Sequence, residues 1–139
     1  MSPFAKQVTL GADRSTPGRY TQDVDSRWNC PVVPQGGMMA AIAARAMADE
    51  LADPSQTLRS LTTVFAAQVP AGPVTVDVSV LRRGRSMSQA LATVRAAGAA
   101  DAGHTTVAVF GQPRPGFEFT GGADPFILRP WHPVGRWRS

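Results

Sequence analysis

Two adjacent glycines at the start of an alanine-rich segment could do chemistry through their backbone amides. Gly36 and Gly37 follow Gln35 and open the segment Met38 to Leu51, which has strong helix formers throughout. The first N–H groups of a helix have no partner inside the helix, and the helix dipole adds partial positive charge there. Such amides can stabilise an oxyanion. Two glycines can also simply permit a tight loop, so both interpretations stay open on the residues alone.

Polar side chains near these glycines form a second set of candidates. Gln35 could orient a water molecule or a bound carbonyl group, but an amide has no usable pKa and cannot act as a base. An exposed loop residue is an equally good interpretation of Gln35. Ser60 and Thr62 follow the helical segment and could line a cleft beside it, although most such residues in strands are structural. Met38 could contact a flexible apolar ligand.

A turn rich in arginine, at residues 82–86, is the third candidate. We expect Gly84 to give this turn a positive φ, as many hairpins require. Because guanidinium groups bind phosphate through paired hydrogen bonds, Arg82 and Arg85, with Ser86 beside them, could hold a phosphorylated ligand. A solvated hairpin tip is the more common role of such a turn.

The other reactive side chains suggest no additional site. His104 and His132 have no cysteine or carboxylate cluster nearby, so no metal site is predicted. Asp77 is expected to point to solvent. Cys30 has no evident activating partner and is expected to be inert. One cysteine cannot form an internal disulfide, which favours a reducing compartment and predicts a cytoplasmic protein.

Length and composition indicate one globular domain. The chain has 139 residues, of which 43% are hydrophobic and 17% charged. The net charge of +4 is spread along the sequence and not concentrated with aromatic residues, which argues against nucleic-acid binding. There is no apolar run long enough to span a membrane.

The elements that must position these candidates are one helix and about five strands. Residues 1–17 are predicted to be a loosely held arm, residues 18–112 the domain, and residues 113–139 an irregular tail rich in proline and glycine. The first two turns of the helix are apolar on every side, so it is expected to be buried. A curved, mostly antiparallel sheet wrapped around it gives an α+β fold. The predicted strands are 19–25, 57–68, 74–81, 86–97 and 104–110.

This order of elements resembles the hotdog superfamily, and most closely the N-terminal repeat of the double-hotdog acyl-CoA thioesterases of the thioesterase II group. Three segments within residues 18–112 carry the resemblance. They are Pro34-Gln35-Gly36-Gly37 before the helix, Leu58-Arg59-Ser60-Leu61 followed by Phe65, and the run Val76-Asp77-Val78-Ser79-Val80-Leu81-Arg82-Arg83-Gly84-Arg85-Ser86.

The resemblance implies a hotdog fold and an enzyme that hydrolyses fatty acyl-CoA thioesters. The amides of Gly36 and Gly37 would hold the carbonyl oxygen, and a carboxylate would activate water. No cofactor is implied, since CoA enters as part of the substrate. The acyl chain would run along the helix, past Met38. The arginine turn would contact the phosphates of CoA.

The sequence departs from the family pattern at the carboxylate. The resemblance places the catalytic aspartate, with its threonine and glutamine partners, in a second repeat that this chain does not contain. At the corresponding position after the helix this chain has Ser60. A non-catalytic acyl-binding or structural hotdog subunit is therefore the alternative. A hydroxyacyl dehydratase would need a catalytic histidine on the helix loop, where neither His104 nor His132 lies.

A lone hotdog domain leaves one edge of its sheet unpaired. Two copies that pair edge to edge would form one continuous sheet and imitate the fused family architecture. The sequence therefore predicts a homodimer or a dimer of dimers.

Overall fold

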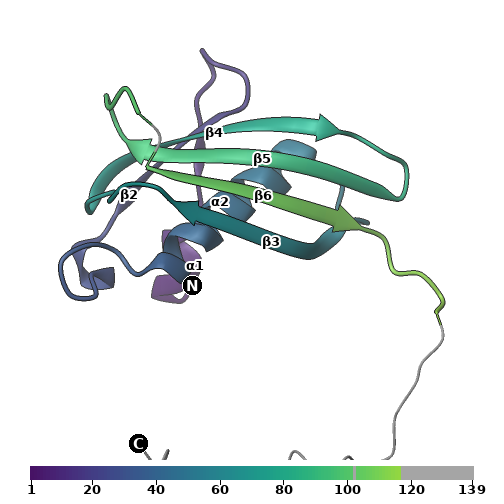
Figure 1. The fold of residues 1–139 in the computed structure, drawn as a ribbon, viewed down its shortest axis with the longest axis horizontal. Coiled ribbons are helices and arrows are strands. Elements are labelled where there is room, and N and C mark those ends of the chain that lie inside the picture. The colour runs from purple at the N-terminus through teal and green to yellow at the C-terminus, as the bar shows by residue number, and fades with distance from the viewer. Residues whose placement is uncertain (102, 117–139) are drawn as a thin grey trace, which may run out of the picture.

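One antiparallel sheet and a long helix contain most of the residues that the structure, a computed structural model, describes: 1–101 and 103–116 (Figure 1). The helices are α1 (Pro3–Gln7) and α2 (Gly36–Leu51), with a short 3-10 helix at Ser26–Trp28. The strands are β1 (Gly11–Ala12), β2 (Arg19–Val24), β3 (Thr57–Phe65), β4 (Gly72–Arg82), β5 (Met87–Ala96) and β6 (His104–Gly111).

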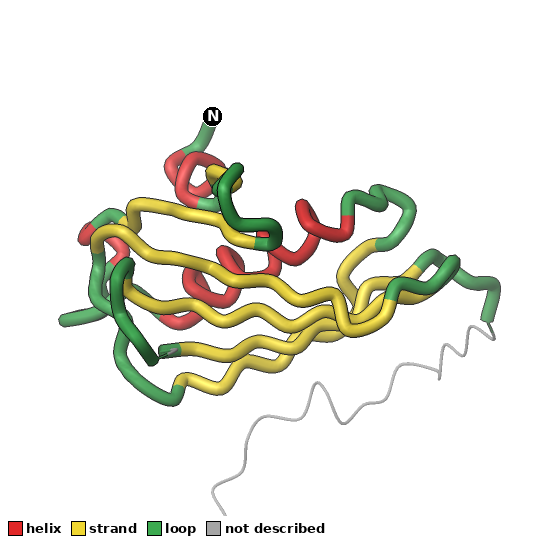
Figure 2. Tube along the Cα trace, turned by 90° about the horizontal axis from the view of Figure 1, so that it is seen from above, coloured by secondary structure: helices red, strands yellow, loops and turns green. Residues whose placement is uncertain are grey.

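The described strands form a six-stranded sheet in the order β1-β2-β4-β5-β6-β3, with antiparallel pairing throughout. The helix α2 lies across one face of this sheet (Figures 1 and 2). The predicted α+β hotdog architecture is thus confirmed. The sixth strand is β1, whose two residues pair with β2. The strand β3 is at the opposite edge and pairs only with β6 in the described part of the chain.

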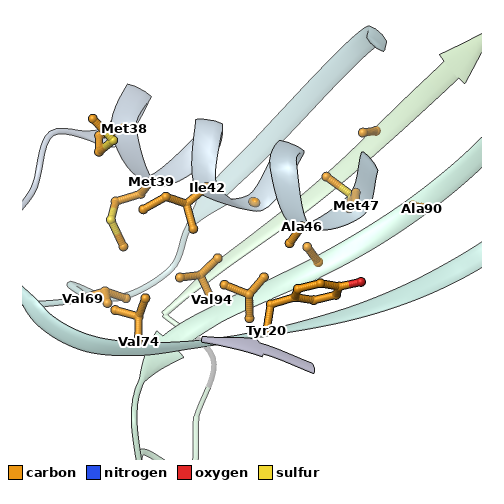
Figure 3. Packing of buried hydrophobic residues seen from close by; sticks show 14 of the residues in the cluster. Tyr20, Met38, Met39, Ile42, Ala46, Met47, Val69, Val74, Ala90 and Val94 are labelled. Atoms are coloured by element: carbon orange, nitrogen blue, oxygen red, sulfur yellow. The ribbon is translucent and has the colours of Figure 1, made fainter. Parts of the chain in front are cut away.

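The core lies between α2 and the sheet face turned towards it. Met39 and Ile42 point from the helix towards Val74 and Val94 of the sheet (Figure 3). Small residues on both surfaces, such as Ala46, let the helix approach the sheet closely. No helix among the described residues is long and apolar enough to cross a membrane.

The segment 1–17 is held more firmly than the predicted loose arm. It contains α1 and β1, and Gln7 is almost fully buried. The Gln7 side chain donates to the carbonyl oxygen of Asp23 at 2.8 Å and accepts from the amide of Asp25 at 3.0 Å. These bonds to β2 and the residue after it could not be inferred from a sequence with weak periodicity. Most of the predicted tail, residues 117–139, lies outside the described residues.

Asp77 does not simply point to solvent. Its carboxylate accepts from Arg19 Nε at 2.7 Å and from Arg95 Nη2 at 3.1 Å, across three neighbouring strands. All three side chains project from the sheet face opposite α2, because Asp77 alternates with the buried Val76. The ion pairs remain one-fifth to one-third exposed, so their stabilising effect is modest.

The glycine in the arginine turn serves a different purpose from the one expected. Gly84 does not have a positive φ; among the described residues Gly18, Gly72 and Gly98 do. A Cβ at position 84 would instead collide with the carbonyl oxygen of Met87. Close approach of the two backbones is therefore the reason for glycine.

The Gly84→Ala substitution is expected to lower the free energy of unfolding by about 3 kcal/mol, because a rigid backbone must move to accept the methyl group. The matched variant is Gly98→Ala. Gly98 has a φ of 79° but no atom within 4 Å of a new Cβ, so only the conformational cost of about 1 kcal/mol applies. Equilibrium urea unfolding measures both values; equal losses would contradict the steric explanation.

Candidate functional site

The helix α2 begins two residues earlier than predicted, so the two glycines form its first turn. Gln35 is the N-cap, and its side-chain oxygen accepts a hydrogen bond from the amide of Met38 at 2.9 Å. Within the described residues, the amides of Gly36 and Gly37 donate to no protein acceptor. The helix therefore presents two free N–H groups at its positive end, as the oxyanion hypothesis requires.

Gln35 stabilises the start of α2 through both its backbone and its side chain. Its backbone amide donates to the carbonyl oxygen of Trp28 at 2.9 Å, which anchors the preceding loop. Its side-chain oxygen is used by the cap, whereas its Nε2 lies against Gly37, 3.0 Å from where a Cβ would be. The predicted role in orienting a water molecule or carbonyl group is therefore restricted to the NH₂ group.

A pocket of about 440 Å³ opens at the start of α2. Gln35 and Gly36 form one side of it, and Phe65, at the end of β3, lies against Gly36. A Cβ on Gly36 would be 3.0 Å from the Cζ atom of Phe65, so glycine allows this close contact without a shift of the ring. The remaining lining residues are Cys30, Val33, Pro34, Ala66, Ala67, Gln68, Val69 and His104. None of the lining residues is a carboxylate.

His104 is the ionisable group buried in the wall of this pocket. Its side chain stacks edge to face with Phe65, with the ring centroids 4.8 Å apart. Only 6% of the residue is exposed, and Nδ1 has no hydrogen-bond partner among the described residues. Burial lowers the pKa of His104 below its ordinary value of 6.5, although the Ala67 backbone acts in the opposite direction. The imidazole is therefore neutral at pH 7.

An apolar groove of about 620 Å³ runs along the exposed side of α2. We call it the alanine groove, because four helix alanines lie along it. It borders the free edge strand β3 and reaches Gly37, next to the pocket. Its lining residues are Phe4, Val8, Gly37, Ala40, Ala41, Ala44, Arg45, Ala48, Gln56, Leu58, Leu61 and Phe110. The two free amides thus lie between a pocket and a long apolar surface.

The family model described as the acyl-CoA thioesterase N-terminal domain matches residues 24–111, which include α2 and the strands β3 to β6. The chain belongs to this family. No curated protein matches the chain.

Solved structures show the same fold for this acyl-CoA thioesterase domain. A candidate thioesterase II from Thermobifida fusca has a TM-score of 0.74 at 20% identity, with 88% of this chain and 44% of that chain covered. A protein from Alicyclobacillus acidocaldarius described as having a hot dog fold has a TM-score of 0.71 at 24% identity, covering 90% and 45%. The acyl-CoA thioesterase II TesB2 from Mycobacterium marinum has a TM-score of 0.70 at 16% identity, covering 86% and 42%. The domain therefore spans less than half the length of these three proteins.

Ser60 and Thr62 do not lie at the candidate site of the domain. Thr62 pairs with Val107 and Ser60 with Val109, on the sheet face turned away from α2. A bulge between Leu58 and Ser60 shifts the alternation there. The expectation that Ser60 and Thr62 line a cleft beside the helix is therefore wrong for the single chain.

Two further predicted contacts are separated from the helix start. Met38 is only 3% exposed and belongs to the core, and it lines neither the pocket nor the alanine groove. The arginine turn lies at the opposite end of α2, where Arg83 donates to the backbone oxygens of Glu50 and Leu51. With 16 residues, α2 separates the two ends by about 24 Å. Arg82, Arg85 and Ser86 therefore do not meet Gly36 within one chain.

The histidine is the residue that sequence reasoning missed. His104 does not lie on the helix loop, but strand pairing brings it to the same end of the fold. His104 pairs with Phe65 of β3 and with Val94 of β5, and all three face α2. Thr106, Ala108 and Phe110 are buried on the same face as His104, but Val107 and Val109 lie on the other face, so the sequence carries no clear signal for the inner face of β6.

Proposed function

We propose that this chain binds fatty acyl-CoA thioesters at the start of α2 and hydrolyses them. The observation that carries the proposal is the pair of free amides at Gly36 and Gly37 between a pocket and an apolar groove, in a chain of the acyl-CoA thioesterase family. A cytoplasmic location is part of the proposal, and the single cysteine supports it.

In this proposal the thioester carbonyl oxygen accepts hydrogen bonds from the amides of Gly36 and Gly37. The negative charge that develops on this oxygen during attack by water is stabilised by the amides and the positive end of α2. The NH₂ group of Gln35, which lies against Gly37, would donate as well. The acyl chain lies along the alanine groove, where apolar surface leaves water.

We propose that a second copy of the chain closes this site. The outer edge of β3 is unpaired within the described residues, and Leu58, Val64 and Phe65 on it are exposed. Pairing two β3 strands antiparallel places the Phe65 end of one beside the Thr57 end of the other. The second copy would therefore cover the alanine groove.

The same pairing offers a role for the arginine turn. The Thr57 end of β3 pairs with Gly111, which also pairs with Met87 next to the arginine turn. In the dimer, Arg82, Arg85 and Ser86 of the second copy would therefore lie towards the helix start of the first. There they could bind the phosphates of CoA, which a single chain does not permit.

The alternative, an acyl-binding subunit without catalysis, is motivated by the lack of a carboxylate on the pocket wall. Release of free thiol from acyl-CoAs of increasing chain length, measured with a thiol reagent on the purified full chain, distinguishes the two functions. We expect saturable turnover. Saturable binding without thiol release would support the alternative, and the absence of both would overturn the proposal.

A further inference from the structure

The buried imidazole of His104 has an unexplained polar atom. Its Nδ1 makes no hydrogen bond among the described residues, although the residue is 94% buried. An unpaired buried polar atom loses its bonds to water without replacement, so buried polar atoms are nearly always satisfied. His104 as a residue lines the pocket that Gly36 also lines, and Nδ1 itself is fully buried behind this wall. A ligand or a water molecule in this pocket would supply the missing partner once the Phe65 ring, which packs against His104, moves aside.

No charged side chain acts on the proton affinity of His104, which burial lowers and the Ala67 backbone raises to a smaller extent. Towards α2, the neighbouring strands present Phe65, Thr63 and Val94, which carry no charge. Arg95 projects from the other sheet face to Asp77. Among the described residues that line the pocket, Cys30 is the only other ionisable side chain. Burial keeps the imidazole in its neutral form, which is the form that can act as a proton acceptor.

Phe65 connects the histidine to the helix start. Its ring stacks on His104, and the tip of the same ring touches Gly36. The imidazole and the free amides are therefore separated by a single aromatic ring. Phe65 is 51% exposed, and exposed side chains change rotamer on the nanosecond timescale. Rotation of this ring would open the space between His104 and Gly36 to a thioester carbonyl and a water molecule.

We propose that His104 is the general base of this chain, in the role that a carboxylate has in the family pattern. The inference rests on the proposed thioester hydrolysis. Water attacks the thioester carbonyl carbon while the imidazole takes a proton from it, and the resulting oxyanion is held by the amides of Gly36 and Gly37. The carbon–sulfur bond then breaks, and the imidazolium returns the proton to the departing thiolate. The products are a fatty acid and CoA thiol.

The test compares His104→Asn with Thr105→Val, a control on the opposite sheet face of the same strand. We expect His104→Asn to lower kcat about 100- to 10,000-fold. Binding of a non-hydrolysable acyl-CoA thioether, measured by calorimetry, should change less than threefold. In the wild type, kcat/KM should fall about tenfold per pH unit below the pKa of His104, because the protonated imidazole accepts no proton. This acid limb should be absent from the residual activity of His104→Asn.

The outcomes separate the two proposals. If the wild type hydrolyses acyl-CoA and His104→Asn keeps its rate and its acid limb, the general base is refuted while the thioesterase function stands. If the wild type binds the thioether but hydrolyses no acyl-CoA, both hydrolysis and the base are refuted. His104→Gln provides a second variant should the asparagine variant not fold.

A readout on the wild type does not depend on activity. The chain has two histidines, so its imidazole nitrogens give two sets of signals in a nitrogen-15 NMR spectrum. We expect the thioether to shift the set that His104→Gln removes. An unchanged set at saturating thioether would overturn the inference.

Discussion

A Gly36→Pro variant is expected to lose about 100- to 1,000-fold in kcat towards acyl-CoA while keeping its fold, because it removes one of the two amides proposed to hold the oxyanion. Proline is well tolerated at the first position of a helix, where the N–H has no helical partner. Gln35 has a φ of −58° and a ψ of 134°, which a residue before proline readily adopts. The substitution thus deletes the donor with little change to the backbone.

The matched control is Gly36→Ala, which adds a Cβ but keeps the amide. Its methyl group would meet the end of the Phe65 ring at 3.0 Å, and this ring is partly exposed and can yield. We expect a loss of less than tenfold in kcat. Initial rates of thiol release for the two variants, with their melting temperatures, give the comparison. Equal losses of kcat in Gly36→Pro and Gly36→Ala would show that the effect comes from steric contact with Phe65 and not from the missing amide.

An Ala44→Glu variant is expected to be monomeric at micromolar concentration, whereas the wild type should be a dimer. Ala44 lies in the middle of the alanine groove, which the second copy is proposed to cover. Burying an unpaired carboxylate there would cost several kcal/mol, and 3 kcal/mol already weakens association by about 150-fold. Light scattering after size-exclusion chromatography measures the effect.

The control for Ala44→Glu places the same charge at Ser79, an exposed residue of β4 whose neighbours Val78 and Val80 alternate with it. Ser79→Glu should remain a dimer. We expect Ala44→Glu to lose thiol release along with its partner, because an open groove leaves the acyl chain in water. A wild-type chain that is itself monomeric would refute the proposed assembly, irrespective of the variants.

The fold could be predicted from the sequence because its strongest patterns are local. Alternating valines identified β4, and an apolar helix with few charges indicated a buried element. The order of the strands in the sheet was harder to predict from the sequence. β4 follows β3 along the chain, but β3 pairs with β6 and not with β4. The sequence also contained no sign of the hydrogen bonds by which Gln7 attaches the first segment to β2.

The candidate site could be predicted only where a single element forms it. The two glycines and their free amides belong to one helix start, and their position follows from the sequence. The faces of Ser60 and His104 depend on a bulge and on pairing between distant strands. The arginine turn was assigned to the same site because a linear sequence does not show which end of a helix a hairpin reaches.

The order of the strands has a consequence for synthesis of the chain. β3 follows α2 directly along the chain, but its hydrogen-bonding partner is β6. Thr57 therefore cannot pair with Gly111 until β6 has been synthesised. During translation, β3 therefore leaves the ribosome with both of its edges open and with Leu58, Val64 and Phe65 uncovered. Contacts between such distant residues slow folding and expose the nascent strand to aggregation. A chaperone that shields residues 57–65 until β6 emerges would increase the yield of native protein.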